Sequence, residues 1–301
     1  MSRFLKYIFF VLCGFAILDV SSRFIFGYFF EHPGKDSRIE AVYKFVFHEN
    51  PDNLVILGAS RADRHYASQQ IEDSLKISLF NYGFEGCSIV HQYLSLLKAI
   101  ENGGLKLVIL DLSTAQLEEE WVHDRNSRYY PYYWKNDTIK NVINKVEGKN
   151  MSFYMLSSLF QYNSQLFNLF IKDKQYKGYS PLPFKNSAVE KIVSDKDPLV
   201  EYKEIEHSVS PLANAYLGEM KKECEIHNIK FVVCISPSFV ISEGNDRYIE
   251  NLCKNINIDC WNMSTTVEIP TFFSDETHLN EKGAELFTGF LIKKIKTEGL
   301  F

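Results

Sequence analysis

The chain has 301 residues, of which 46% are hydrophobic and 24% are charged, so it can bury a sizeable core. Its formal net charge of -5, with no run rich in Lys and Arg, argues against a nucleic-acid-binding surface. The spacing of its cysteines and histidines matches no zinc pattern, and no motif for an organic cofactor is present. We therefore expect neither a metal nor a cofactor.

The first 30 residues predict a membrane anchor. Two basic residues precede an apolar run over 7–18, and a second apolar piece covers 24–30. Together these pieces are long enough to cross a bilayer if Asp19 and Arg23 reach the interface or find partners. Two alternatives stay open, a cleaved signal peptide and an amphipathic helix packed on the chain's own domain. The anchor is the preferred interpretation, and it predicts a single-pass protein of the cell membrane whose domain lies in the periplasm or outside the cell.

Short apolar runs that alternate with helix-compatible segments predict a parallel sheet. Strands are expected over residues 53–57, 77–81, 105–112, 229–235 and 258–263, and helices over 62–75, 88–102, 211–227, 245–255 and 280–297. Parallel strands need right-handed crossovers, which place helices on both faces of the sheet. The predicted fold class is therefore α/β, a three-layer α/β/α sandwich with a flavodoxin-like parallel sheet of about five strands.

The alternation is suspended over about residues 114–210, which are rich in Tyr, Asn and Lys. A structureless loop of this length is improbable in a compact domain, so we expect a long helical insertion after the third strand. The predicted division is an anchor over 1–30 and an α/β domain over 31–301 that contains this insertion.

Polar segments follow the predicted strands, at the end where open parallel sheets bind ligands. Ser60 follows the first strand, Gly83 the second and Ser113 the third, and the segment from Asp275 to His278 follows the last. Acyl transfer needs a nucleophile, a base that takes its proton and a group that orients the base. Ser60, His278 and Asp275 fit these three roles.

Two backbone amides complete this prediction. The N–H groups of Ser60 and Gly83 are expected to bind the negative charge that develops on the carbonyl oxygen. Arg61 is a candidate contact for an anionic substrate group, and residues 63–65 are expected to form a polar helix face.

Each of these residues also has an interpretation without chemistry. Ser60 can be the N-cap of a helix, and His278 can be a surface residue before one. Asp275 and Gly83 can serve a turn, and Arg61 can be a solvated side chain of a first helical turn.

Three segments resemble the sequence blocks of the SGNH (GDSL-like) hydrolase superfamily: GASR around Ser60, NYGFEG around Gly83, and DETHLN over 275–280. The resemblance covers roughly residues 53–112 and 229–297, and its Asp-x-x-His-Leu-Asn run is the most specific part. It implies a flavodoxin-like fold with a serine nucleophile in the first block and its acid and base in the last. One departure is the missing Gly-x-Asn of the third block. Either Ser113, Gln116 or the insertion supplies that oxyanion donor, or the oxyanion hole is incomplete.

With its N-terminal anchor the chain is most similar to the membrane-anchored cell-envelope branch, which includes DltD-like proteins and polysaccharide acetyltransferases and esterases. The resemblance implies an exported serine esterase or O-acyltransferase that acts on an acylated cell-envelope glycan or carrier. A membrane-bound acyltransferase is a further expected partner, and nucleic acid is not. The alternative function is a non-catalytic module that binds glycan or scaffolds an envelope acyltransferase.

Overall fold

The computed structural model describes residues 3–34, 43, 51–118, 126–171, 177–184, 210–240 and 243–301. The chain forms two compact units. The helical unit combines residues 1–48 with 126–174, and the sheet unit combines 49–125 with 175–301. Part of the predicted insertion thus belongs to the same unit as the N-terminal helix.

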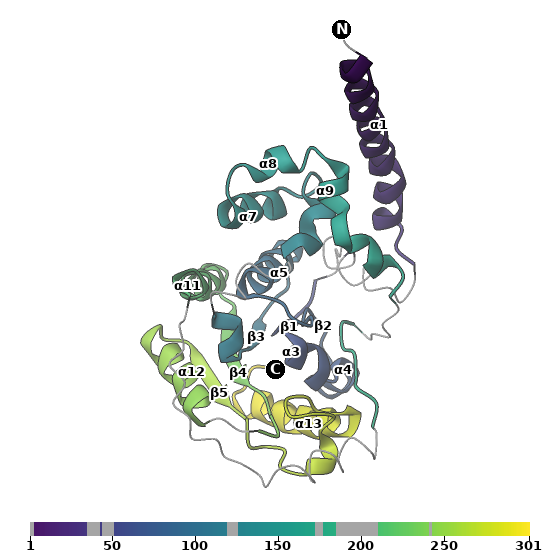
Figure 1. Ribbon diagram of the computed structural model, residues 1–301. Helices are drawn as coiled ribbons and strands as arrows, with labels where there is room; N and C mark the ends of the chain where they lie inside the picture. Colours follow the sequence, from purple (N-terminus) through teal and green to yellow (C-terminus); the bar gives the residue numbers. More distant parts are fainter. Residues whose placement is uncertain are drawn as a thin grey trace. The chain divides into compact units, whose positions relative to one another are not determined.

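The sheet unit is built on five parallel strands in the order β2-β1-β3-β4-β5 (Figure 1). Their bounds are Leu54–Gly58 for β1, Leu79–Asn81 for β2, Leu107–Asp111 for β3, Lys230–Ile235 for β4 and Asp259–Asn262 for β5. β1 and β3 are buried along their whole length, as expected of strands covered on both faces. The predicted five-stranded parallel sheet is confirmed.

Helices cover both faces of this sheet. They are α3 (Ser60–His65), α4 (Ser68–Leu75), α5 (Ile89–Asn102), α11 (Pro211–Ile226), α12 (Glu243–Asn255) and α13 (Glu281–Thr297), with 3-10 turns η1 (Thr114–Leu117) and η4 (Pro270–Phe272). α13 packs against α3 and α4 on one face, whereas α5 packs against α11 on the other (Figure 1). This arrangement confirms the three-layer sandwich.

The helix predicted over residues 62–75 is two helices, α3 and α4, so its continuity was predicted wrongly. Tyr66 ends α3, is fully buried, and its hydroxyl donates to Asp111 Oδ2 at 2.7 Å. The next amide, that of Ala67, donates to Thr288 Oγ1 on α13 at 3.0 Å. Contacts with distant segments therefore break a helix that local propensity would continue.

Gly58 shapes the turn that delivers Ser60 from β1 to α3. Its φ of +145° is disfavoured for residues with a side chain. A Cβ at this position would lie 2.6 Å from Ala62 Cβ and 2.8 Å from the carbonyl oxygen of Asp111. The close packing of α3 on the ends of β1 and β3 therefore requires glycine.

We expect Gly58→Ala to destabilise the protein by roughly 2–4 kcal/mol, because it adds both backbone strain and a steric clash. The matched control is Gly218→Ala in α11, where no atom lies within 4 Å of the added Cβ and helix propensity favours alanine. Urea denaturation of the full chain in detergent micelles measures both. Equal stabilities for the two variants would contradict the assigned role of Gly58.

The helical unit consists of short helices and one long one. Its elements are α1 (Arg3–Glu31), η2 (Asn126–Tyr132), α7 (Asp137–Glu147), α8 (Met151–Tyr154), α9 (Ser158–Tyr162) and η3 (Asn163–Leu169). The described part of the predicted insertion is thus helical over much of its length, and residues 119–125, 172–176 and 185–209 lie outside the described residues.

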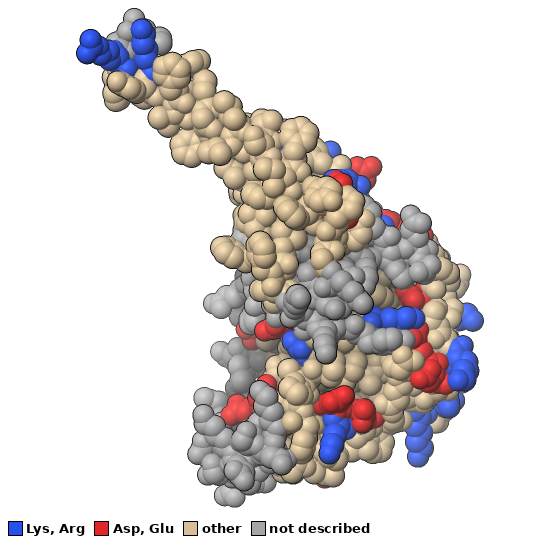
Figure 2. Space-filling model, turned by 90° about the vertical axis from the view of Figure 1, so that its right-hand side faces the viewer, with Lys and Arg blue, Asp and Glu red and all other residues tan. Residues whose placement is uncertain are grey.

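α1 has the length and composition of a membrane-crossing helix or a signal sequence. Its most apolar 18-residue window has a mean hydropathy of 1.9, and 6% of that window is buried. Basic side chains gather at its N-terminal end, and an uncharged surface follows along its length (Figure 2). The predicted apolar N-terminal segment is confirmed as a single continuous helix.

Candidate active site

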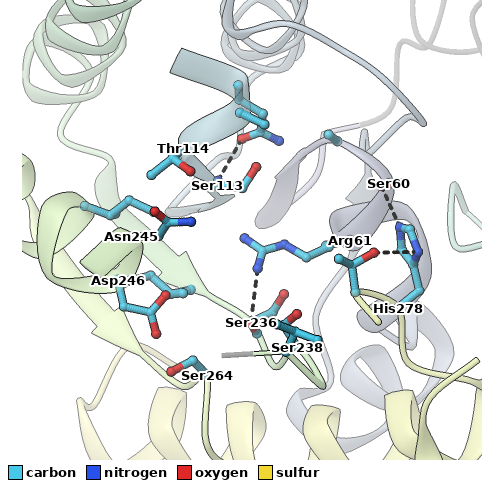
Figure 3. A pocket seen from close by; sticks show the side chains of 17 residues that line it. Ser60, Arg61, Ser113, Thr114, Ser236, Ser238, Asn245, Asp246, Ser264 and His278 are labelled. Carbon is cyan, nitrogen blue, oxygen red and sulfur yellow. Dashed lines mark hydrogen bonds between the residues drawn. The ribbon is translucent and has the colours of Figure 1, made fainter. Parts of the chain in front are cut away.

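Ser60, His278 and Asp275 lie in hydrogen-bonding contact, although 214 residues separate Ser60 from Asp275 in the chain. His278 Nε2 is 2.8 Å from Ser60 Oγ (Figure 3). His278 Nδ1 is 2.9 Å from Asp275 Oδ2. When Nδ1–H donates to the carboxylate, Nε2 is left as an acceptor for the Ser60 hydroxyl. The arrangement therefore has the geometry for transfer of the hydroxyl proton to the imidazole.

The segment that carries Asp275 and His278 is a tight loop. It is closed by an antiparallel bridge between Phe273 and Leu279, and the Ser274 amide donates to the His278 carbonyl at 2.8 Å. Asp275 Oδ1 accepts from the amides of Thr277 and His278 at 2.8 and 2.9 Å. These two hydrogen bonds thus fix the position of the Asp275 carboxylate without any substrate.

The electrostatic setting keeps Asp275 ionised. Burial by itself would raise the pKa of the Asp275 carboxyl, but the hydrogen bonds from the His278 side chain and from the Thr277 amide outweigh it. The net effect holds this pKa below its ordinary value. Asp275 is therefore available as an anion to orient the His278 ring and to stabilise the imidazolium that forms when the ring takes a proton.

His65 anchors the loop that carries Asp275 and His278. The Leu279 amide donates to His65 Nε2 at 3.0 Å, so the other ring nitrogen carries the proton and donates to Ser236 Oγ at 3.0 Å. His65 is fully buried, and burial lowers its pKa well below the ordinary value, with the charge of Arg61 lowering it further and Asp275 opposing. A neutral imidazole therefore holds the residue that follows His278.

The predicted polar face over residues 63–65 is wrong. Asp63 and His65 are buried, and Arg64 donates to the carbonyl oxygen of Ser180 at 2.8 Å. The charged residues at 63–65 are typical of a solvated helix, but α3 lies between the sheet and α13. The only sequence signal for His65 was its position five residues after Ser60.

We expect His65 to make the protein sensitive to acid. Below pH about 6.5 the unfolded chain binds a proton at this residue and the folded chain does not, so the free energy of unfolding falls by up to about 1.4 kcal/mol per pH unit. His65→Gln should reduce this slope. The control is His227→Gln at the exposed end of α11, which should keep it.

Urea denaturation of the full chain in micelles at several pH values gives both slopes. If the His65→Gln variant loses stability with acid as steeply as the parent chain, the buried neutral imidazole is not the cause.

Arg61 is held by the ends of two strands. Its guanidinium donates to the Leu112 carbonyl at 2.7 Å and to the Ser236 carbonyl at 3.4 Å, and it pairs with Asp111 Oδ1 at 3.1 Å. Its side chain is 15% exposed, whereas that of Asp111 is 1% exposed. Arg61 thus compensates a buried carboxylate, and little of it is left for a substrate.

A cavity of about 310 Å³ borders the triad and is lined by residues from four strand ends. Ser60 and His278 lie at one side of it, Asn245, Asp246 and Ser264 at the opposite side, and the Arg61 guanidinium lies between them (Figure 3). The polar lining also includes Ser113, Thr114, Gln116, Ser236, Ser238 and Thr277. Hydroxyl and amide groups therefore dominate the polar lining of the space next to Ser60.

Gly83 does not supply the predicted oxyanion donor. Its amide donates to Asn81 Oδ1 at 2.8 Å and is therefore already used. A Cβ at this position would collide with the backbone of Ala62 and Asp63, so glycine is needed for the close approach of this turn to α3. The turn interpretation of Gly83 accounts for the residue.

The third strand end offers a side-chain donor instead. The Ser113 amide donates to Gln116 Oε1 at 3.2 Å, so this amide is also used. The same bond fixes the Gln116 carboxamide at the cavity, and among the described residues no hydrogen bond from its Nε2 is found. Ser113 and Gln116, the two residues predicted for the third block, thus both border the cavity.

Sequence reasoning missed Asn245 and Asp246 in the cavity wall. They lie in the first turn of α12, where polar residues normally serve as helix caps, so no local signal separates them from ordinary capping residues. Ser236 and Ser238 had a weak signal, because they follow β4 at the end of the sheet where the other candidate residues lie.

No family model matches the sequence, and neither does any curated protein. Solved structures do match. A proposed acylhydrolase from Bacteroides fragilis is 10% identical with a TM-score of 0.43, over 89% of this chain and 99% of that one. A GDSL-like lipase from Bacteroides thetaiotaomicron is 10% identical with a TM-score of 0.38, over 81% and 88%. An acetyl xylan esterase from the rumen bacterium Butyrivibrio proteoclasticus is 10% identical with a TM-score of 0.36, over 84% and 66%.

Proposed function

We propose that this protein is a serine esterase or O-acyltransferase that works through an acyl-enzyme formed on Ser60. The observation that carries the proposal is the contact of Ser60 Oγ with His278 Nε2 at 2.8 Å, with Asp275 on the other ring nitrogen. A serine hydroxyl is a poor nucleophile at neutral pH, and this arrangement is the one that activates it.

The reaction has two halves. Ser60 Oγ attacks the carbonyl carbon of the ester while its proton passes to His278 Nε2, and the Asp275 carboxylate stabilises the imidazolium. The carbon–oxygen bond of the ester then breaks, and the imidazolium gives its proton to the departing alkoxide. In the second half His278 takes a proton from water or an acceptor hydroxyl, whose oxygen attacks the acyl carbon. The bond from that carbon to Ser60 Oγ then breaks, and the imidazolium returns its proton to Ser60 Oγ.

Two donors are proposed for the charge on the carbonyl oxygen. The Ser60 amide lies at the first position of α3, where an N–H has no acceptor within the helix. The Gln116 Nε2 group borders the same cavity. Losing one such donor typically costs a factor of about 100 to 1,000 in kcat.

The substrate proposed is an acylated cell-envelope glycan or a related carrier. The cavity volume of about 310 Å³ is at the lower end for ligand pockets, roughly 300–1,000 Å³, which favours a short acyl group. Its hydroxyl and amide lining suits a hydroxyl-rich leaving group or acceptor. The resemblance of the GASR and DETHLN segments to SGNH hydrolases supports ester chemistry.

The proposed location is the cell membrane, with α1 as a single-pass anchor and the sheet unit in the periplasm or outside the cell. The length and apolar surface of α1 support the anchor, and Arg3 and Lys6 at its start support a cytoplasmic N-terminus. A membrane-bound acyltransferase that supplies the acyl group is the partner proposed for the transfer reaction.

We expect Ser60→Ala to lower kcat/KM for a small acetyl ester by a factor of about 10⁴ or more, because the acyl-enzyme cannot form. The matched control is Ser74→Ala, at an exposed position of α4. The measurement is hydrolysis of p-nitrophenyl acetate, together with labelling by a serine-reactive phosphonate. Full activity in the Ser60→Ala variant would refute the proposal.

Asp275→Asn should lower kcat by a factor of about 100 to 10,000, because the neutral amide neither selects the required His278 tautomer nor stabilises the imidazolium. Glu268→Gln is the control, since it removes an exposed carboxylate from the same region. Steady-state kinetics on the same ester gives both values. An increase in KM with kcat unchanged would contradict an orienting role.

A non-catalytic glycan-binding or scaffolding function is the second proposal, and one observation favours it. The Gly83 amide, an oxyanion donor in the predicted site, donates to Asn81, and the Gly-x-Asn of the family's third block is absent from the sequence. This function predicts glycan binding that survives Ser60→Ala and no phosphonate labelling of the parent chain.

A further inference from the structure

The helical unit exposes far more large apolar side chains than the sheet unit. Outside α1 its described residues include nine exposed ones, at Trp134, Phe153, Tyr154, Leu156, Leu159, Phe160, Phe167, Phe170 and Ile171. The much longer described part of the sheet unit exposes four, at Phe184, Ile226, Ile269 and Phe290. Concentrated apolar exposure of this kind marks an interaction surface.

Five of these side chains belong to one corner, which is formed by α8, α9 and the turn between them over residues 153–160. Phe153 is 73% exposed and Leu156 57%, and Tyr154, Leu159 and Phe160 complete the corner. Aromatic side chains of this kind are enriched at membrane–water interfaces, where rings sit at the level of the lipid headgroups.

The corner is fastened to α1 by polar contacts. Asp19 Oδ1 accepts from Ser157 Oγ at 2.7 Å and from the Leu159 amide at 3.0 Å, and Asp19 Oδ2 accepts from the Ser158 amide at 3.2 Å. The carboxylate of α1 therefore caps the N-terminus of α9, and Arg23 donates to the Leu156 carbonyl. Both charges that interrupt the apolar helix have partners in the corner.

Apolar contacts extend this attachment along one face of α1. Phe26 and Phe30 pack on the Tyr162 ring, with centroids 5.8 and 5.1 Å apart. The other face stays apolar and open, since Val20, Phe24, Ile25 and Tyr28 are all more than half exposed. The exposed surface of α1 therefore continues past Asp19 to the level of the corner.

Helix geometry gives the depth of the corner. At about 1.5 Å per residue, Asp19 lies about 22 Å and Arg23 about 28 Å along the helix from Phe4. The hydrocarbon core of a bilayer is about 30 Å thick. A helix that enters the core at Phe4 thus brings Arg23 close to the far boundary of the core and Asp19 to about 8 Å inside it, so the corner bound to both lies near that boundary.

We propose that the corner over residues 153–160 inserts its apolar side chains into the interfacial layer of the bilayer that α1 crosses. The occupant is the lipid surface itself, and the argument is the continuity of the corner with the exposed face of α1 at the required depth. The inference rests on the proposed anchor and is independent of the chemistry at Ser60. It makes the helical unit a two-point membrane attachment.

Three tryptophan probes test this inference in the full chain, reconstituted into vesicles of phosphatidylcholine and phosphatidylglycerol. Phe153→Trp reports on the corner, Phe10→Trp on the membrane helix, and Ile226→Trp on an exposed position of the sheet unit. Lipids brominated near the headgroup or near the chain end quench tryptophans at the matching depth. The parent chain, measured in parallel, removes the contribution of the three native tryptophans.

The Phe153→Trp emission should be lost chiefly with headgroup-proximal bromine, the Phe10→Trp emission with deep bromine, and the Ile226→Trp emission with neither. If Phe10→Trp is quenched and Phe153→Trp behaves like Ile226→Trp, the corner is outside the lipid and is open to a protein partner, and the inference is wrong. If neither is quenched, α1 is not embedded and the inference falls with the anchor. Ester hydrolysis on the same vesicles reports separately on the Ser60 site.

Discussion

The Leu279 amide and the His65 ring nitrogen, 214 residues apart in the chain, form the hydrogen bond on which the site geometry depends. It joins the first helix after β1 to the loop before α13. Because His278 precedes Leu279, this bond sets where the imidazole stands relative to Ser60. A buried histidine is suited to this task, because burial favours its neutral form. In that form one ring nitrogen is an acceptor and the other carries the proton that it donates to Ser236.

A second network lies under the cavity. Asp111 ends β3 inside the protein, and its charge is balanced by Arg61 while its other oxygen accepts from Tyr66. A buried carboxylate without such partners would be costly, so the three side chains are mutually dependent. The network locks α3 to the strand ends, which explains why the residue after Ser60 has a structural role in addition to lining the cavity.

In the helical unit, the charged residues within the apolar helix α1 also have polar partners. Asp19 and Arg23 would be unfavourable on a lipid-facing surface, and both lie on the face of α1 that contacts α9. The opposite face carries exposed apolar side chains, among them Val20, Phe24, Ile25 and Tyr28. The spacing of 19, 22–23, 26–27 and 30 places the attachment on one stripe of the helix, since residues three and four apart share a face.

Local patterns determined much of this fold by themselves. Apolar runs such as LVIL and KFVVCI predict the buried parallel strands, because a strand covered on both faces has no polar side. The Asp-x-x-His spacing predicts the Asp275–His278 contact, because a loop of three residues can close it. The length and flanking charges of the first 30 residues predict a single apolar helix.

The tertiary structure alone decided the rest. Residues 62–75 form two helices, and the Gly83 amide donates to Asn81. His65 is buried, and Asn245 and Asp246 line the cavity. The physical reason is that each of these outcomes depends on partners distant in the chain or on the path of a turn. Hydrophobic periodicity predicts which face of an element is buried, but it does not predict which polar group of another segment that face will contact.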